Sequence, residues 1–191
     1  MSQAASGYDR IDGDRYYTPR WVVEALQSVE QFDGVVWDPA AGAGHIVDCF
    51  PAGAFGTDIA PDREDIKEKD FLTIHPEWNH GARHIVTNPP YGQGGRLAVE
   101  FILYALLLTR PRLQRPGGKV AMLLRVDFDS ANTRRGIFKE HPAFSAKYTL
   151  TKRIRWANLP QTDSGPTDNH AWFVWDWSKQ RARHRIYDYL P

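Results

Sequence analysis

A single cysteine, Cys49, occurs in the 191 residues, so no disulfide can form within the chain. Such sparing use is typical of proteins in a reducing compartment, and we expect a cytoplasmic location. The seven histidines are scattered without zinc-ligand spacing, so no metal site is predicted. The longest apolar run, 101–108, is too short to span a membrane and indicates a buried helix face. The first 15 residues lack an apolar stretch, and we expect no signal peptide.

The remaining composition is that of an ordinary globular protein. Hydrophobic residues make up 42% and charged residues 25% of the chain, close to the averages for such proteins. A length of 191 residues suffices for one hydrophobic core and is short for two. We therefore expect a flexible N-terminal segment at residues 1–15 and a single domain at residues 16–191.

Charge is unevenly distributed along the chain, although the formal net charge is only +1. Residues 1–90 carry 15 acidic and 7 basic side chains, whereas residues 91–191 carry 8 acidic and 17 basic ones. A basic second half would suit a polyanionic partner such as a nucleic acid. Mutual neutralisation of the two halves inside the fold explains the charges equally well.

Strand-like runs alternate with helical patterns over residues 16–126. Strands are expected at the start of 34–50, in 53–60, 65–72, 83–91 and 119–126, and helices in 16–32, after the glycine turn at 38–44, and in 96–110. Thr18 would cap the first helix, with Pro19 at its first position. This alternation predicts a doubly wound, Rossmann-like α/β sheet, mostly parallel, with helices on both faces. Two later runs, 146–160 and 169–177, have no helix between them and predict an antiparallel hairpin at the edge of the sheet.

The stretch DPAAGAG at 38–44 follows the first predicted strand, where open α/β sheets bind ligands. Gly42 and Gly44 permit a sharp turn and close contact between a ligand and the main chain. A dinucleotide site would need a third glycine at position 47, which is valine, and Asp38 disfavours a phosphate. A carboxylate at this place suits a cationic ligand with an ammonium or sulfonium group.

Two further acidic residues follow later strands. Asp58 ends the second predicted strand, where a carboxylate typically binds the two hydroxyls of a ribose. Asp70 could accept a hydrogen bond from the amino group of an adenine. A helix cap or turn is the alternative role for Asp58, and a surface turn for Asp70. Together with DPAAGAG, these residues predict a site for an adenosine with a charged, non-phosphate tail.

Residues 88–91, Asn-Pro-Pro-Tyr, follow the fourth predicted strand. Two consecutive prolines make a rigid turn, because each has a fixed φ and no N–H. The side-chain oxygen of Asn88 and the carbonyl of Pro89 would then be two fixed acceptors, suited to a planar NH2 group. Accepting both hydrogens localises charge on the nitrogen and favours its attack on an electrophile. Tyr91 supplies a flat face on which a base could stack.

Five short motifs resemble, in content and order, those of the S-adenosylmethionine-dependent amino-methyltransferases, in particular the DNA adenine-N6 methyltransferases. They are YYTP (16–19), DPAAGAG (38–44), TDIA (57–60), KDFL (69–72) and TNPPYG (87–92). The resemblance covers residues 16–125 and, more loosely, the later RIRW and NHAWFVW segments. It implies a class I methyltransferase that transfers a methyl group from S-adenosylmethionine to the N6 amine of adenine in DNA. No separate target-recognition domain is recognisable, which is similar to compact phage-type or orphan members.

The resemblance also implies roles for individual positions. In the family, the Thr-Pro segment and the glycine turn hold methionine, the acid of the third motif holds ribose, and an acid like Asp70 lies near adenine. The implied cofactor residues are Tyr17, Thr18, Pro19, Asp38, Ala40, Gly42, Gly44, Asp58, Ile59, Asp70, Phe71 and Asn88. The implied catalytic residues, which bind the target amine, are Asn88, Pro89, Pro90 and Tyr91.

A base inside a duplex cannot reach such a pocket, so the target would be flipped out or single-stranded. Tyr91 would stack on one face of the base and Trp156 on the other, with core packing as the alternative role for Trp156. The basic residues that could contact phosphates are Arg134, Arg135, Lys152, Arg153 and Arg155, with Arg181, Arg183 and Arg185 in the tail. A solvated surface position is the alternative for each of them.

Other substrates stay open at the level of sequence. The same chemistry serves on adenine in RNA and on a protein glutamine amide, and a non-catalytic nucleic-acid-binding module could share the fold. The basic second half favours a nucleic acid, and we expect DNA as the partner. Without a target-recognition domain, sequence specificity would come from loops or from a separate specificity or nuclease partner.

Overall fold

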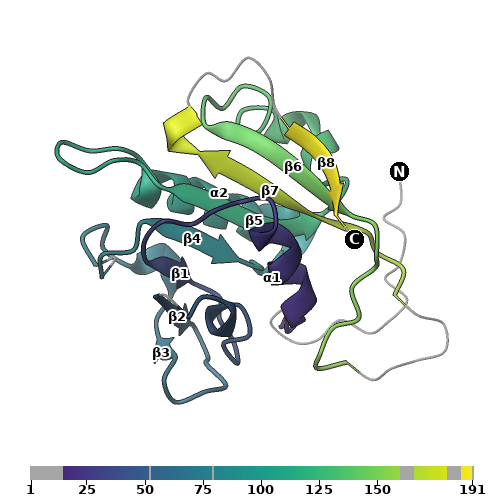
Figure 1. The fold of residues 1–191 in the computed structure, drawn as a ribbon, viewed down its shortest axis with the longest axis horizontal. Helices are drawn as coiled ribbons and strands as arrows, with labels where there is room; N and C mark the ends of the chain where they lie inside the picture. The colour runs from purple at the N-terminus through teal and green to yellow at the C-terminus, as the bar shows by residue number, and fades with distance from the viewer. Residues whose placement is uncertain (1–14, 52, 79, 160–165, 180–185, 191) are drawn as a thin grey trace.

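The computed structural model describes residues 15–51, 53–78, 80–159, 166–179 and 186–190 (Figure 1). The N-terminal segment expected at residues 1–15 lies outside these ranges except for Arg15. The strands are β1 (Val36–Asp38), β2 (Ala54–Asp58), β3 (Lys67–Glu68), β4 (His84–Thr87), β5 (Lys119–Arg125), β6 (Phe144–Leu150), β7 (His170–Asp176) and β8 (Ile186–Leu190). The helices are α1 (Arg20–Gln27) and α2 (Arg96–Thr109), with 3-10 turns η2 (Val47–Cys49), η3 (Phe71–Thr73), η4 (Gln93–Gly95), η5 (Phe128–Ser130), η6 (Asn132–Arg134) and η7 (Trp177–Lys179). None of the helices in the described ranges has both the length and the hydrophobicity needed to span a bilayer.

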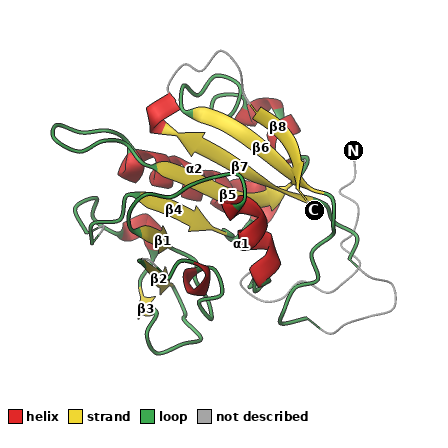
Figure 2. Cartoon of the chain, viewed as in Figure 1, coloured by secondary structure: helices red, strands yellow, loops and turns green. Residues whose placement is uncertain are grey.

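All of these strands join one sheet in the order β3-β2-β1-β4-β5-β7-β6-β8 (Figure 2). Neighbouring strands from β3 to β5 run parallel, β7 runs antiparallel to both of its neighbours, and β8 runs parallel to β6. The strand order reverses between β1 and β4, so a ligand crevice is expected at the carboxyl ends of these two strands. The predicted doubly wound, mostly parallel sheet is confirmed.

The antiparallel pair predicted near the C-terminus is present, but it does not lie at the edge of the sheet. β7 is inserted between β5 and β6, and β8, which was not predicted, is the outermost strand. Every residue of β7 is buried, whereas four of the five residues of β8 are exposed. The continuous apolar run of β7 suits an interior strand that is covered on both faces.

The sheet has a hydrophobic layer on each face, because neighbouring residues of a strand point to opposite sides. Val86 of β4 packs in the layer that contains Leu26 of α1, whereas its neighbour Ile85 packs in the layer that contains Ile102 of α2. In Figure 1, α1 lies in front of the sheet and α2 behind it. The prediction of helices on both faces is therefore confirmed, with one α-helix on each face within the described ranges.

Two details of the helix predictions are wrong. The segment after the glycine turn, expected to be a helix, contains only the 3-10 turn η2. Only nine residues separate the glycine turn at 38–44 from the start of β2, too few for a helix and its connections. Helix α1 begins at Arg20 with Pro19 as its N-cap, so Thr18 is not the cap and is instead buried.

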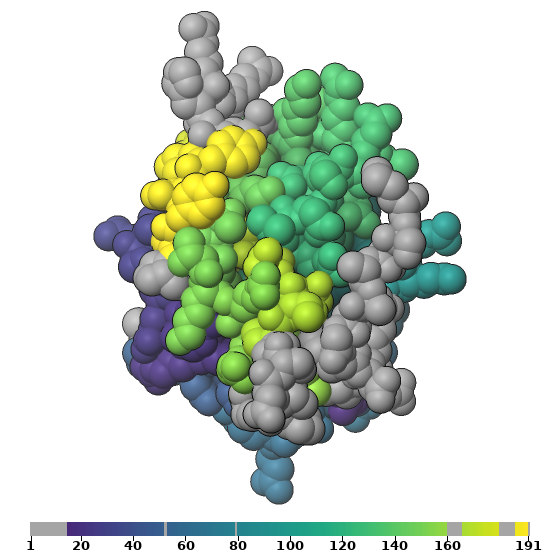
Figure 3. Space-filling model, turned by 90° about the vertical axis from the view of Figure 1, so that its right-hand side faces the viewer, coloured from purple at the N-terminus to yellow at the C-terminus, as the bar shows by residue number. Residues whose placement is uncertain are grey.

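The strands β1, β2, β4, β5 and β6 all end on one side of the sheet, called here the carboxyl edge, and β7 begins there. Figure 3 looks toward this side of the molecule. The green segments around β6 and the yellow-green start of the 166–179 segment lie next to one another on it. Loops that are distant in the sequence therefore meet at the carboxyl edge.

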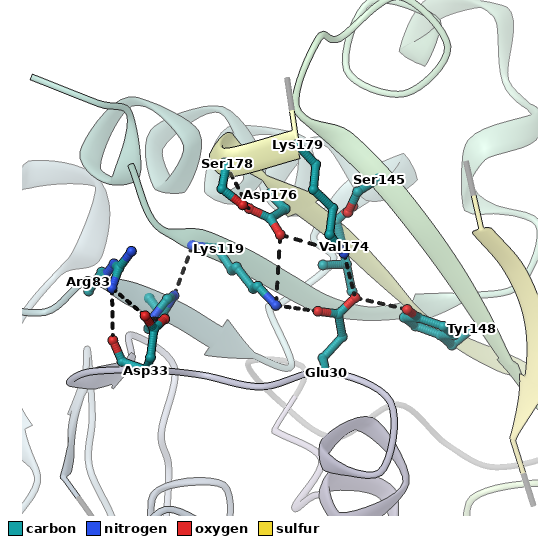
Figure 4. Close-up of polar contacts among 11 residues, drawn as sticks. Glu30, Asp33, Arg83, Lys119, Ser145, Tyr148, Val174, Asp176, Ser178 and Lys179 are labelled. Atoms are coloured by element: carbon teal, nitrogen blue, oxygen red, sulfur yellow. Dashed lines mark hydrogen bonds and ion pairs between the residues drawn. The ribbon is translucent and has the colours of Figure 1, made fainter. Parts of the chain in front are cut away.

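A cluster of charged and polar side chains, called here the ion cluster, combines the buried Glu30, Tyr148 and Asp176 with the partly buried Lys119 and the exposed Lys179 (Figure 4). The Glu30 carboxylate is 3% exposed, accepts a hydrogen bond from the Tyr148 hydroxyl at 2.8 Å and pairs with the Lys119 ammonium at 2.5 Å. The Asp176 carboxylate lies 3.8 Å from the same ammonium and 3.7 Å from that of Lys179. The ion cluster joins the segment after α1 to β5, β6 and β7.

Candidate active site

A pocket opens at the carboxyl edge, where β1, β2 and β4 end. Its walls come from residues 15–18, from the glycine turn, from the ends of β2 and β4, from residues 69–72 and from the start of α2. The lining includes Tyr17, Thr18, Asp38, Ala40, Gly42, Asp58, Ile59, Asp70, Phe71 and Asn88, all of which the sequence assigned to the cofactor. Pro19 and Gly44 complete that assignment but do not line the pocket. The fold therefore brings the five motifs to one place.

Asp38 is the most deeply buried acid of the pocket, with 1% of its surface exposed. Its carboxylate accepts a hydrogen bond from the Ala40 N–H at 3.2 Å. Burial, and to a lesser extent the nearby charge of Asp58, raises the pKa of this carboxyl to about 7. The group is therefore close to half-protonated at neutral pH, and a cation in the pocket would stabilise its charged form.

The glycine turn is held in place from β2. Gly42 and Gly44 have φ values of +51° and +80°, a region that favours glycine. The Asp58 carboxylate accepts the Gly42 N–H at 2.8 Å and the Ala60 N–H at 2.9 Å. Asp58 thus has the turn role left open above, and it also lines the pocket. Its contact with a ribose stays a prediction.

Residues 15–18, called here the strap, cross the pocket beside the glycine turn. The Tyr17 ring stacks on His45 with centroids 5.0 Å apart, and its hydroxyl donates to the Asp62 carboxylate. A Cβ added to Gly42 would lie 3.2 Å from this ring. The strap therefore packs directly against the turn, and a side chain at position 42 would crowd the Tyr17 ring.

Asn88 directly follows β4, lines the pocket and is half-buried. Its side-chain Nδ2 donates to the Tyr16 carbonyl of the strap at 3.0 Å. This bond determines the orientation of the amide, since the nitrogen faces the strap and Oδ1 is left as an acceptor. Pro89 is buried and Pro90 lines the pocket, so the turn after β4 is packed into the protein.

Tyr91 is held in place through both its hydroxyl and its ring. Its hydroxyl accepts the Arg125 N–H at the end of β5 at 2.5 Å, and its ring meets Phe128 edge-on with centroids 5.9 Å apart. Burial is the largest cause of a raised pKa at Tyr91, so the phenol stays neutral. No sequence pattern indicated Arg125, which becomes part of the site through the pairing of β4 with β5.

Asp70 and Phe71 form the wall opposite the strap. The Asp70 carboxylate accepts the Leu72 N–H at 3.0 Å and so caps η3, which is the turn role left open above. Phe71 is 1% exposed and packs on Phe101 of α2 with centroids 4.9 Å apart. Phe101 and Leu97 also line the pocket, and they were missed because an apolar helix face reads as core.

Trp156 is 4% exposed and lies between two other rings. Its centroid is 5.4 Å from that of Tyr16 and 5.2 Å from that of His170. These contacts agree with the packing alternative for Trp156. Burial is the largest cause of a lowered pKa at His170, to about 4, so this imidazole is neutral at physiological pH.

The basic residues after β5 have partners within the fold. The Arg134 guanidinium donates to the carbonyls of Phe128 at 2.9 Å and Gly94 at 2.8 Å, and lies 3.7 Å above the Phe128 ring. It therefore joins the loop after Tyr91 to η5. Arg135 is ion-paired with Glu140. Phosphate contacts by Arg134 and Arg135 stay predictions.

The loop after β6 carries three exposed basic side chains at the carboxyl edge. Arg153 donates to the Asn169 side chain at 3.1 Å, and the Lys152 ammonium lies 5.0 Å from the centre of the Trp21 ring. Arg155 is exposed on the same loop. The predicted residues Arg181, Arg183 and Arg185 lie outside the described residues. Within the described ranges no group of acidic, histidine and cysteine side chains could hold a metal ion.

No protein-family model and no curated protein matches the chain. Solved structures do match its fold. A Vibrio vulnificus protein named as the modification subunit of a type I restriction enzyme is 20% identical, with a TM-score of 0.61 over 93% of this chain and 47% of its own. A Listeria monocytogenes protein named as a class I S-adenosylmethionine-dependent methyltransferase is 12% identical, with a TM-score of 0.62 over 96% of this chain and 68% of its own. A Pyrococcus horikoshii protein named as an RNA methyltransferase is 16% identical, with a TM-score of 0.56 over 89% of this chain and 90% of its own.

The chain spans about half the length of the Vibrio subunit. At identities of 12–20%, the likeness concerns the fold and not the substrate. The chain has the class I methyltransferase fold, with its pocket at the carboxyl ends of β1, β2 and β4.

Proposed function

We propose that the chain is an S-adenosylmethionine-dependent methyltransferase that methylates the exocyclic N6 amine of adenine in DNA. The observation that carries the proposal is the orientation of Asn88. Its amide nitrogen is bound to the Tyr16 carbonyl at 3.0 Å, which leaves Oδ1 as an acceptor at the rim of the pocket. Together with the Pro89 carbonyl, the second acceptor that the Asn-Pro-Pro-Tyr sequence predicts, this oxygen would match the two hydrogens of an NH2 group.

The residues of the pocket fit this cofactor. The buried carboxyl of Asp38 complements the positive charge of an ammonium or sulfonium group, and Asp58 offers carboxylate oxygens to ribose hydroxyls. The glycine turn leaves room that a side chain at Gly42 would narrow. When bound, S-adenosylmethionine supplies a methyl group that is activated by the charge on its sulfur.

The chain's own contribution is to make the target amine nucleophilic. The lone pair of adenine N6 is delocalised into the purine ring, so the free amine reacts poorly. Asn88 Oδ1 and the Pro89 carbonyl each accept one amine hydrogen and localise the lone pair on the nitrogen. The nitrogen would then give its lone pair to the methyl carbon while the carbon–sulfur bond breaks and its electron pair goes to the sulfur, and it would lose its extra proton to solvent. No side chain is needed as a general base.

Two observations favour DNA as the substrate. The exposed basic side chains of Lys152, Arg153 and Arg155 lie at the carboxyl edge, where they could contact phosphates beside the target adenine. One protein of the same fold is named as the modification subunit of a restriction enzyme. The target base would be flipped out or single-stranded and would stack on Tyr91. Loops at the carboxyl edge or a separate subunit would provide sequence specificity.

Incorporation of labelled methyl groups from S-adenosylmethionine into DNA, RNA and protein tests the proposal. We expect label in DNA, recovered as N6-methyladenine. Label confined to RNA or to a protein amide would reassign the substrate while retaining the chemistry. A protein that binds S-adenosylhomocysteine and DNA but labels none of the three acceptors would instead be a nucleic-acid-binding module.

Asp38 makes cofactor binding dependent on pH. Its carboxyl has a pKa raised by burial to about 7, and a bound cation should lower that value by stabilising the carboxylate. Binding should therefore release protons near pH 7 and weaken progressively as the pH falls below 7. Titration of S-adenosylhomocysteine at pH 7 in two buffers with different ionisation enthalpies measures the released protons. Equal proton release by the wild type and by Asp38→Asn would contradict this prediction.

A further inference from the structure

The strap is fastened to the loop after β6 by three hydrogen bonds. Asn158 Oδ1 accepts the Tyr17 N–H at 3.0 Å, and Asn158 Nδ2 donates to the Arg15 carbonyl at 2.8 Å. The Ala157 N–H donates to the Tyr17 carbonyl at 3.1 Å. One side chain thus uses both ends of its amide on the same short stretch of backbone, more than 140 positions earlier in the sequence.

The strap in turn contacts both halves of the candidate site. On the cofactor side, the Tyr17 ring packs against Gly42 and stacks on His45. On the target side, the Tyr16 carbonyl accepts the Asn88 Nδ2–H at 3.0 Å. Movement of the strap would therefore change the shape of the pocket and release the amide of Asn88 together.

The ion pair of Arg15 is less suited to determine the position of the strap. The Arg15 guanidinium reaches the Asp62 carboxylate only at 3.5 Å, and both side chains are about one-third exposed. Such an exposed pair contributes little because water screens it. The Asn158 amide is half-buried and makes two well-formed bonds to backbone groups, which cost free energy when they are left without partners.

We propose that Asn158 is a positioning residue, which holds the strap so that the cofactor pocket keeps its shape and Asn88 presents its oxygen to the target amine. Asn158 itself does not line the pocket, so it would act through the strap. The inference deepens the proposed function and rests on it for the identity of the cofactor and the target. The fastening of the strap can be tested without either.

Hydrogen exchange in the protein without ligand tests the fastening directly. In Asn158→Ala the Tyr17 N–H loses its acceptor, and we expect its exchange to become at least tenfold faster. In Asn158→Asp the carboxylate still accepts the Tyr17 N–H but cannot donate to the Arg15 carbonyl, so an intermediate rate is expected. Asn132→Ala, at an exposed position on η6, is the matched control and should exchange like the wild type at Tyr17.

Ligand affinity and kinetics test the consequence. Loss of the two hydrogen bonds of Asn158 should let the strap move and so weaken binding in the pocket. We expect the Kd of S-adenosylhomocysteine to rise by about tenfold in Asn158→Ala. We expect kcat for DNA methylation to fall at least as much, while the KM for DNA changes less than twofold, because the basic side chains of the loop remain. A merely structural role would lower the melting temperature without this difference between kcat and KM.

The outcomes separate this inference from the proposed function. Wild-type exchange at Tyr17 and wild-type affinity for S-adenosylhomocysteine in Asn158→Ala would overturn the inference, whatever the protein methylates. Faster exchange and weaker ligand binding in Asn158→Ala, in a protein whose wild type methylates no DNA, would refute the proposed function and support the role of Asn158 in the pocket. An intermediate result for Asn158→Asp would support the assignment of the two separate bonds.

Discussion

Replacement of Asn88 by alanine should lower kcat for methyl transfer by about 10²–10³-fold, the range found when one preorganised electrostatic contact is removed from an active site. Asn88 Oδ1 is one of only two acceptors proposed for the target amine. The variant loses that acceptor and also the bond from Nδ2 to the Tyr16 carbonyl. The rate of formation of N6-methyladenine in DNA, measured at saturating S-adenosylmethionine, gives the effect.

Asn88→Asp separates the two roles of this side chain. The carboxylate retains an acceptor for the amine but cannot donate to the Tyr16 carbonyl, so its activity should lie between those of the wild type and Asn88→Ala. Both variants should still bind S-adenosylhomocysteine within a few-fold of the wild type, because most of the pocket is unchanged. Full activity of Asn88→Ala would mean that the target amine is activated elsewhere, and the proposed mechanism would fail.

Replacement of Glu30 by alanine should destabilise the fold by about 3 kcal/mol. Removing one partner of a buried ion pair typically costs about 3–5 kcal/mol, because the remaining charge is left in a poorly solvated place. Lys119 would retain Asp176 at 3.8 Å, which places the expected cost near the lower end of that range (Figure 4). Tyr148 would also lose the acceptor of its hydroxyl, now 2.8 Å away. For a chain of this length, such a loss should lower the melting temperature by roughly 6–12 °C.

Glu24→Ala is the matched control for Glu30→Ala. Glu24 pairs with Arg20 one helical turn away at 2.7 Å, but both side chains are more than half exposed. Water and salt screen such a pair, so this variant should change the melting temperature little. Equal losses of stability in thermal and urea unfolding would contradict the prediction that the buried ion pair of Glu30 contributes more than the exposed pair of Glu24. Glu30→Gln, which keeps the size of the side chain, should fall between the alanine variant and the wild type.

Much of the fold was predictable from local patterns. The end of β2 at Asp58 agrees with the prediction. β4 lies within the range expected for the fourth strand and ends at Thr87, two positions before Pro89, since proline cannot donate to the strand pairing. The parallel sheet followed from the alternation of short strands with helical patterns, since parallel neighbours need a crossover between them. Helix α2 was predictable because its apolar residues recur over 14 positions.

Local patterns failed where a residue's role depends on distant partners. The run around Trp172 and Val174 indicates a strand, but its place inside the sheet depends on pairing with both β5 and β6. Arg134 looks like a solvated cation until Gly94 and Phe128 are brought beside it. The same holds for Trp156, whose burial depends on Tyr16 and His170.

The sequence by itself determined where polar motifs follow strands, and hence which residues meet at the carboxyl edge. Strand periodicity, glycine turns and the rigid Pro89-Pro90 pair act within a few residues, so they can be recognised in a linear chain. Only the tertiary structure decided how the strap is held, because Asn158 reaches Tyr17 across 141 positions. Such a contact depends on the packing of the whole sheet between the two segments, and no local preference of either segment encodes it.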